Sequence, residues 1–92
     1  MKKLPTYQSD KLIAEFIVDN PDYAKKYLRA TMRETRLKER NIEIAMRYIT
    51  SDESYKEVGE HYGLTLERIR QITHKLMRVI GVLLRRIERK VA

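Results

Sequence analysis

The sequence predicts an all-α fold of four to five helices that ends in a helix-turn-helix and a long last helix. Its 92 residues include only two prolines and three glycines, and apolar residues recur every three or four positions almost throughout. A chain of this length forms one domain with one modest core. We expect residues 1–8 to be a flexible arm and residues 9–92 to be a single helical domain.

A polar residue is expected to start the first helix, because Ser9 or Asp10 can accept hydrogen bonds from its first free amides. The apolar stripe of this helix consists of Leu12, Ile13, Phe16 and Ile17. Residues 20–22, Asn-Pro-Asp, then predict a break and a restart. Asparagine can cap a helix, proline fits its first position, and aspartate favours its positive end.

The second helix is expected to run from residue 21 to about residue 38. Its predicted inward positions are Tyr23, Tyr27, Ala30 and Met32. A third helix is expected over residues 39–49, where apolar residues at helical spacing are Ile42, Ala45, Met46 and Ile49. No glycine or proline marks the boundary within residues 35–40, so one long helix is an alternative there.

Residues 54–78 have the pattern of a helix-turn-helix. Ser54 and Glu57 form a capping box at the start of a short helix, and Gly63 can adopt the left-handed conformation of a tight turn. Thr65 caps a long helix that is expected over residues 66–90 and is interrupted by Gly81. The predicted core of the motif consists of Val58, Tyr62, Leu64, Ile69 and Ile72.

The distribution of charge indicates an anionic partner, and double-stranded DNA is the partner we predict. The formal net charge is +7. Residues 66–92 contain eight Lys and Arg against two Asp and Glu, whereas residues 1–65 contain twelve against eleven. The excess therefore lies on the last helix, as expected of an element that contacts phosphates, although a basic solvated face of an ordinary helix pair has the same composition.

The side chains expected to face the major groove carry suitable chemistry. Glu67, Gln71 and His74 lie on one face of the last helix, and glutamate can accept from cytosine while glutamine can bind adenine. Arg68, Lys75 and Arg78 flank this face and can reach phosphates, and Arg70 at its edge suits either role. The helix amides at Ser54 and Thr65 can also hold phosphates.

The same motif resembles region four of primary bacterial sigma factors, the helix-turn-helix that reads the −35 promoter element. The resemblance rests on Glu-Val-Gly at residues 57–59, on Tyr62 and Thr65, and on the string Glu-Arg-Ile-Arg-Gln-Ile at residues 67–72, followed by Lys75 and Arg78. It implies base contacts for Glu67 and Gln71. It also implies that Arg68, Arg70 and Lys75 contact DNA or neighbouring activators.

The sequence departs from the family at three positions. Leu66 replaces an arginine that reads a base, and Thr73 and His74 replace a Glu-Ala pair. We therefore expect an altered target sequence, in which Leu66 can contact a thymine methyl group. The chain has no room for a strand-melting region, so a free-standing module is expected, and a phage or another mobile element is a plausible source.

An apolar stripe continues along the last helix beyond the motif. It consists of Leu76, Ile80, Leu83, Leu84 and Ile87. In one interpretation this stripe is core that the first helices cover. In the other it binds a partner, either a second copy of the chain or RNA polymerase, because the family clasps an apolar helix of the polymerase β flap. A helix lying on a membrane surface is disfavoured, because the motif explains its basic residues better.

Several classes of function are disfavoured by composition. The absence of cysteine excludes disulfides and thiolate metal sites and fits a cytoplasmic location. His61 and His74 lack the neighbours of a metal site, and no nucleophile motif or glycine-rich phosphate loop is present. We expect no cofactor, no metal, no membrane partner and no catalysis.

The sequence thus predicts a DNA-binding transcription regulator that acts at promoters with RNA polymerase. One alternative is a protein-interaction module that mimics sigma and binds or redirects RNA polymerase without reading DNA. Another is a dimeric repressor of ordinary helix-turn-helix type, which requires a homodimer and a symmetric operator.

Overall fold

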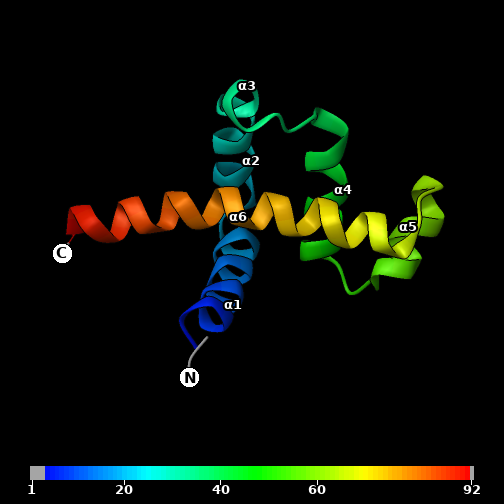
Figure 1. Cartoon of the computed structure of the whole chain (residues 1–92), viewed down its shortest axis with the longest axis horizontal. Coiled ribbons are helices and arrows are strands. Elements are labelled where there is room, and N and C mark those ends of the chain that lie inside the picture. Colours follow the sequence, from blue (N-terminus) through cyan, green and yellow to red (C-terminus); the bar gives the residue numbers. More distant parts are fainter. Residues whose placement is uncertain (1–3, 92) are drawn as a thin grey trace.

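A computed structural model shows an all-α architecture in which one long helix connects the whole molecule (Figure 1). The structure describes the backbone of residues 4–91 and the side chains of residues 10–87. Six helices occur among the described residues: α1 Leu4–Asp19, α2 Pro21–Ala30, α3 Met32–Thr35, α4 Glu39–Thr50, α5 Tyr55–Tyr62 and α6 Leu66–Val91. Helices α1, α2, α4 and α5 all pack against α6. The predicted fold class is confirmed, with a one-turn helix, α3, added.

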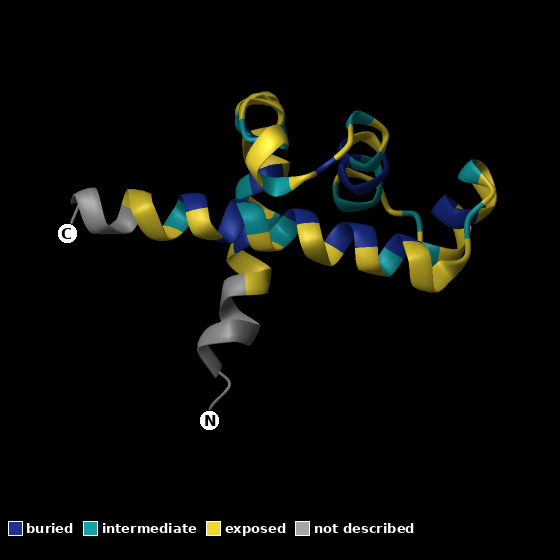
Figure 2. Ribbon diagram, turned by 45° about the horizontal axis from the view of Figure 1, so that its top comes forward, coloured by how far each residue is buried: buried dark blue, intermediate teal, exposed yellow. Residues whose placement is uncertain are grey.

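The core lies where α6 faces the other helices (Figure 2). Its large, fully buried apolar side chains come from every helix except α3: Ile17 of α1, Leu28 of α2, Ile42 and Ile44 of α4, Val58 of α5, and Ile69, Leu76 and Ile80 of α6. Ile44 belongs to this core although the spacing of α4 did not predict it. One continuous core therefore joins the N-terminal helices to the helix-turn-helix.

Helix α1 differs from its prediction at the N-terminal end. It begins at Leu4, so residues 4–8 are helical rather than an arm, and Ser9 and Asp10 lie inside the helix instead of capping it. Residues 1–3 of the predicted arm lie outside the described residues. The earlier start is sterically allowed because Pro5 lies in the first turn, where a missing backbone N–H has no consequence.

The junction between α1 and α2 corrects the expected role of Asn20. Its side-chain Nδ2 donates to the Phe16 carbonyl oxygen at 3.1 Å, so it satisfies the end of α1 rather than the start of α2. Two predicted inward positions, Tyr23 and Ala30, are exposed, whereas Ala24 and Leu28 are buried. Leu12 of α1 is also exposed. Apolar spacing leaves the rotation of each helix about its own axis open, and packing against α6 selects that rotation.

The chain between α2 and α4 turns at a residue that is not glycine. Helix α3 ends at Arg36, which has a positive φ of 61°, and its amide donates to the Met32 carbonyl oxygen at 2.8 Å. The left-handed conformation costs a non-glycine residue roughly 1 kcal/mol. It redirects the chain so that Leu37 enters the core. The prediction of one helix over residues 21–38 is therefore wrong, and α4 starts at Glu39 as predicted.

Gly81 allows α1 to cross closely over α6. Helix α6 continues through this glycine without a break, so the predicted interruption does not occur. A Cβ atom placed at Gly81 would lie 3.1 Å from Cδ1 of Ile13. The missing side chain therefore leaves space for a buried residue of α1 at the crossing point.

Candidate nucleic-acid interface

The first helix of the motif, α5, begins with a complete capping box. The Glu57 amide donates to Oγ of Ser54 at 3.1 Å, and the Ser54 amide donates to Oε1 of Glu57 at 2.8 Å. These two bonds satisfy amides that a helix start otherwise leaves free. The predicted start of the helix is confirmed.

The turn between α5 and α6 depends on two glycines for different reasons. Gly63 has a φ of 71° and ends α5 in the left-handed conformation, as predicted. Gly59 is a buried helical residue, and a Cβ atom there would lie 2.5 Å from the Leu64 carbonyl oxygen. The Leu64 amide donates to the Gly59 carbonyl oxygen at 2.8 Å, so the turn folds directly onto this glycine.

Helix α6 then starts with Thr65 as its cap. The Arg68 amide donates to Oγ1 of Thr65 at 3.1 Å. Val58, Ile69 and Ile72 are buried between the two helices, and Tyr62 and Leu64 are partly buried against them. The predicted core of the helix-turn-helix is confirmed.

Two arginines of α4 hold the end of α5, which the sequence did not predict. Nη2 of Arg40 donates to the Tyr62 carbonyl oxygen at 3.0 Å, and the guanidinium carbons of Arg40 and Arg47 lie 6.0 and 5.8 Å from the centre of the Tyr62 ring. Arg47 also pairs with Glu53 at 2.7 Å. These contacts fix α4 against the motif, and their separation in sequence leaves no local signal.

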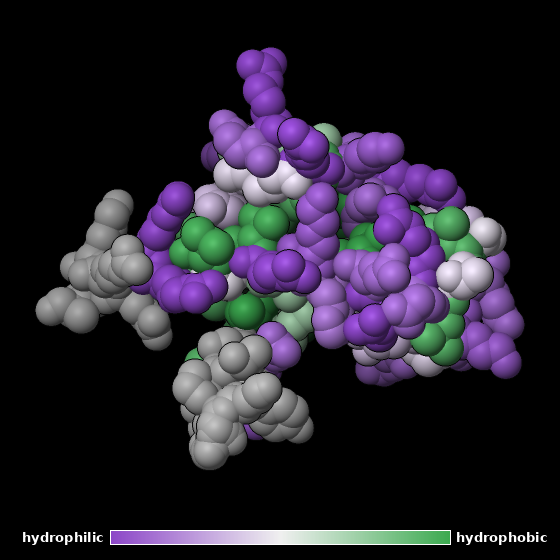
Figure 3. Space-filling model, in the orientation of Figure 1, coloured by the Kyte–Doolittle hydropathy of each residue, from purple (hydrophilic) through white to green (hydrophobic). Residues whose placement is uncertain are grey.

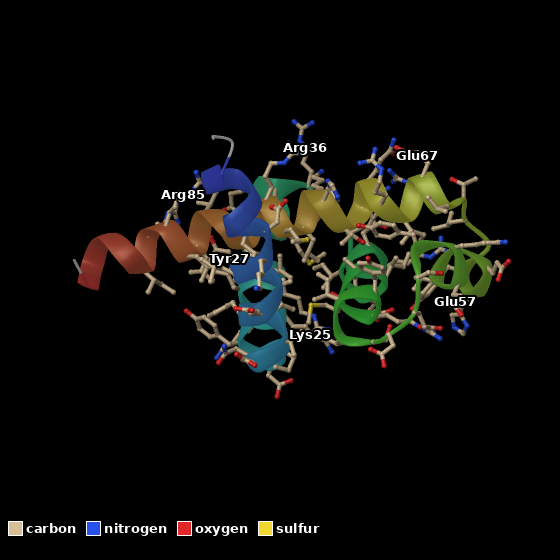
Figure 4. All side chains as sticks on the ribbon, turned by 90° about the horizontal axis from the view of Figure 1, so that it is seen from below. Lys25, Tyr27, Arg36, Glu57, Glu67 and Arg85 are labelled. Atoms are coloured by element: carbon tan, nitrogen blue, oxygen red, sulfur yellow. The ribbon has the colours of Figure 1, made fainter. Side chains whose placement is uncertain are left out.

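The polar face predicted to read bases lies in solvent. The exposed residues of this interface are Ser54, Thr65, Leu66, Glu67, Arg68, Gln71, His74, Lys75 and Arg78, and Arg70 is partly buried. Glu67 lies on the side of α6 that points away from α4 and α5 (Figure 4). Hydrophilic side chains cover most of the N-terminal half of α6 on the corresponding face (Figure 3). Contact between these residues and DNA stays a prediction.

Most of the predicted partner-binding stripe is part of the core. Leu76, Ile80 and Leu83 are buried against the other helices of the same chain, so the prediction that they form a docking surface is corrected. Leu84 is partly buried, and Ile87 is 38% exposed. The apolar spacing of α6 is thus explained mainly by α1, α2 and α4, which is the intramolecular interpretation of the stripe.

Two further features lie beside the interface. An open groove of about 780 Å³ is lined by residues of α1, α4, α5 and α6, among them Asp10, Tyr48, His74 and Arg78. Within the described side chains, Oγ1 of Thr73 is buried and has no hydrogen-bond partner. The groove therefore places α1 beside the exposed polar face of α6.

Neither a metal site nor a membrane span is found in the described part of the chain. No three His, Asp or Glu side chains gather there in an arrangement that could hold a metal ion. None of the described helices combines the length and the apolarity that crossing a bilayer requires.

The fold and the exposed polar face define a helix-turn-helix protein. Residues 37–80, just under half of the chain, match the family described as sigma-70, region 4. The match covers α4, α5 and the first part of α6, and it supports a sigma-70 region 4-like module with a DNA-binding role related to transcription. No curated protein and no solved structure shows a significant match to the chain.

Proposed function

We propose that this protein is a sequence-specific DNA-binding transcription regulator that acts at promoters together with RNA polymerase. The observation that carries this proposal is the exposed polar face of α6 within a module that matches sigma-70 region 4. In a helix-turn-helix, the N-terminal part of the second helix enters the major groove while the first helix crosses the backbone. Helix α5 is the first helix of the motif and α6 is the second, so we assign these two roles to them.

The side chains on this face divide into base readers and phosphate contacts. Glu67 can accept a hydrogen bond from the cytosine amino group, and Gln71 can bind adenine through two bonds. Leu66 is 48% exposed at the start of α6, where it can contact a thymine methyl group. Arg68, Lys75 and Arg78 provide positive charge for phosphates.

Selection from a random duplex pool, followed by titration against salt, tests this proposal. The wild-type protein should enrich one sequence. Gln71→Ala should relax the preference at one base pair by about fivefold or more. Lys75→Ala should weaken binding to all sequences alike and reduce the slope of log K against log salt by about 0.9.

Lys26→Ala is the matched control, because Lys26 is an exposed lysine on α2, outside the motif. It should leave both the preference and the salt slope unchanged. If the wild-type protein enriches no sequence, the proposal fails, even where its binding depends on salt.

A second candidate function is a protein-interaction module that mimics sigma and redirects polymerase without reading DNA. It is favoured by Leu66, an exposed apolar residue where the family has a base-reading arginine. A pulldown with core RNA polymerase combined with a DNA footprint separates the two functions. Polymerase binding without a footprint, alone or in the complex, would support the mimic.

A further inference from the structure

Two residues of the exposed polar face of α6, which we call the reading face, are bound to each other. Nε of Arg70 donates to Oε1 of Glu67 at 3.1 Å, and Nη2 donates to Oε2 at 2.5 Å. The planar guanidinium fork therefore holds both oxygens of one carboxylate. The two residues are three positions apart on α6, so a single turn of helix brings them together.

Arg70 also interacts electrostatically with Tyr55, which belongs to the first helix of the motif, α5. The Arg70 guanidinium lies near the phenol of Tyr55, and the two side chains influence each other's ionisation. The Tyr55 ring stacks on Tyr48 of α4, with 4.2 Å between centres and 15° between planes. Burial is the main reason why the pKa of Tyr55 is raised to about 12, so the phenol stays neutral. A neutral aromatic stack therefore joins α4 to α5 within electrostatic range of Arg70.

Both members of the pair remain charged at neutral pH. The hydrogen bond from Arg70 is the main cause that lowers the pKa of Glu67, and the bond to Glu67 is the main cause that raises the pKa of Arg70. A free carboxylate on this face would be repelled by phosphates, whereas the pair has almost no net charge. The two carboxylate oxygens offer about four lone-pair sites, and Arg70 uses one on each oxygen. The remaining sites can accept a hydrogen bond from a base.

We propose that Arg70 is a positioning residue, which orients the Glu67 carboxylate to read one base pair and does not act as an independent phosphate contact. The inference rests on the proposed DNA-binding function. It assigns a single role to Arg70, whereas the sequence alone allowed it to contact either a base or a phosphate. It also makes the specificity of Glu67 depend on the geometry of the guanidinium fork, which a lysine cannot reproduce.

The test compares Arg70→Lys, Glu67→Gln and the double variant with the wild-type protein. Base preference is measured by selection and competition, and affinity for non-specific duplex is measured separately. Arg70→Lys keeps the charge and loses the fork, so preference at one base pair should fall by about tenfold. Glu67→Gln should lose preference at the same base pair. The double variant should lose no more base preference than either single variant, because each of the three variants disrupts the same Arg70–Glu67 pair.

Lys75→Ala is the matched control. It also removes a positive charge from α6, but a lysine has no guanidinium fork that could hold a carboxylate. It should weaken all sequences alike and leave the base preference unchanged. Affinity of Arg70→Lys for non-specific duplex should stay within about twofold of the wild-type value, because its charge is kept. Thermal unfolding should be nearly unchanged in each variant, because an exposed ion pair contributes little to stability.

Three outcomes overturn the inference. If Arg70→Lys keeps the wild-type base preference, Arg70 does not position Glu67, although the proposed function stands. If the effects of the two single variants multiply in the double variant, the residues act independently. If the wild-type protein itself shows no base preference, the proposed function fails and this inference fails with it.

Discussion

The matched module, residues 37–80, and the helices that precede it differ in how their structure is specified. In the module, local chemistry marks each element: Ser54 with Glu57 starts α5, Gly63 ends it, and Thr65 starts α6. In α1 to α3 the local sequence signals do not predict where the helices begin and end. Helix α1 starts earlier than predicted, and Arg36 turns the chain without a glycine. The N-terminal helices are therefore placed by packing against the module.

This difference does not make the N-terminal helices an independent addition. Ile13 and Ile17 of α1 belong to the same core as Leu76 and Ile80 of α6, and Gly81 allows the close crossing. A small domain with one continuous core unfolds in a single cooperative transition. The comparison consequently predicts that a destabilising substitution in α1 also destabilises α6, the proposed recognition helix.

Removing a buried side chain from α1 should have the largest effect. Ile17→Ala should lower the free energy of unfolding by about 2–5 kcal/mol, because it leaves a cavity in the shared core. Urea unfolding followed by circular dichroism measures this value. The control Val18→Ala should change it by less than about 0.5 kcal/mol, since Val18 is 51% exposed. Two unfolding transitions in Ile17→Ala, with the module unfolding at the same urea concentration as in the wild type, would show that the two regions unfold separately.

The second largest difference is expected when a glycine is replaced by alanine, which adds one methyl group. Gly59→Ala places a Cβ atom 2.5 Å from a backbone oxygen that cannot move without opening the turn. We expect a loss of about 1–3 kcal/mol in unfolding free energy, together with weaker DNA binding.

Gly81→Ala is its counterpart on α6, at the point where α1 crosses that helix. The nearest atom to its Cβ is the end of the Ile13 side chain, at 3.1 Å, and no backbone atom is among its near neighbours. Alanine favours the helix by about 1 kcal/mol over glycine. We therefore expect little net change in stability, measured by the same urea titration. A larger loss in Gly81→Ala than in Gly59→Ala would contradict the comparison.

The two predicted helix caps should show the smallest difference. Ser54→Ala removes a capping bond from α5 and should cost about 1 kcal/mol in the free energy of unfolding. Asn20→Ala removes one exposed bond to the Phe16 carbonyl oxygen and should cost about 0.5 kcal/mol. Thermal unfolding of both variants provides the measurement. Equal losses would mean that Asn20 caps α2 after all.

The fold of the module could be predicted because its signals are local. A capping box, a left-handed glycine and a threonine cap act within four residues, so they are visible in the sequence. The rotation of α1 and α2 could not be predicted in the same way. Tyr23 and Ala24 are neighbours on one helix, and only contact with α6 decides which is buried.

The exposed side of the candidate site was also predictable, and its internal contacts were not. Helical periodicity places Glu67 and Gln71 on one face, and the structure leaves that face in solvent. The hydrogen bonds from Arg70 to Glu67 depend on the rotamers of both side chains. The contacts of Arg40 and Arg47 with Tyr62 join residues that are far apart in the chain. Periodicity also could not tell a buried stripe from a docking stripe on α6.

The sequence by itself determined the all-α class, the position of the helix-turn-helix and the polar face of α6, because helical periodicity and capping are short-range effects. The tertiary structure decided which apolar residues are covered, how closely α1 crosses α6 at Gly81, and that Arg70 binds Glu67 on the reading face. The physical reason is that burial and side-chain pairing depend on neighbours in space, and periodicity along one helix does not identify those neighbours.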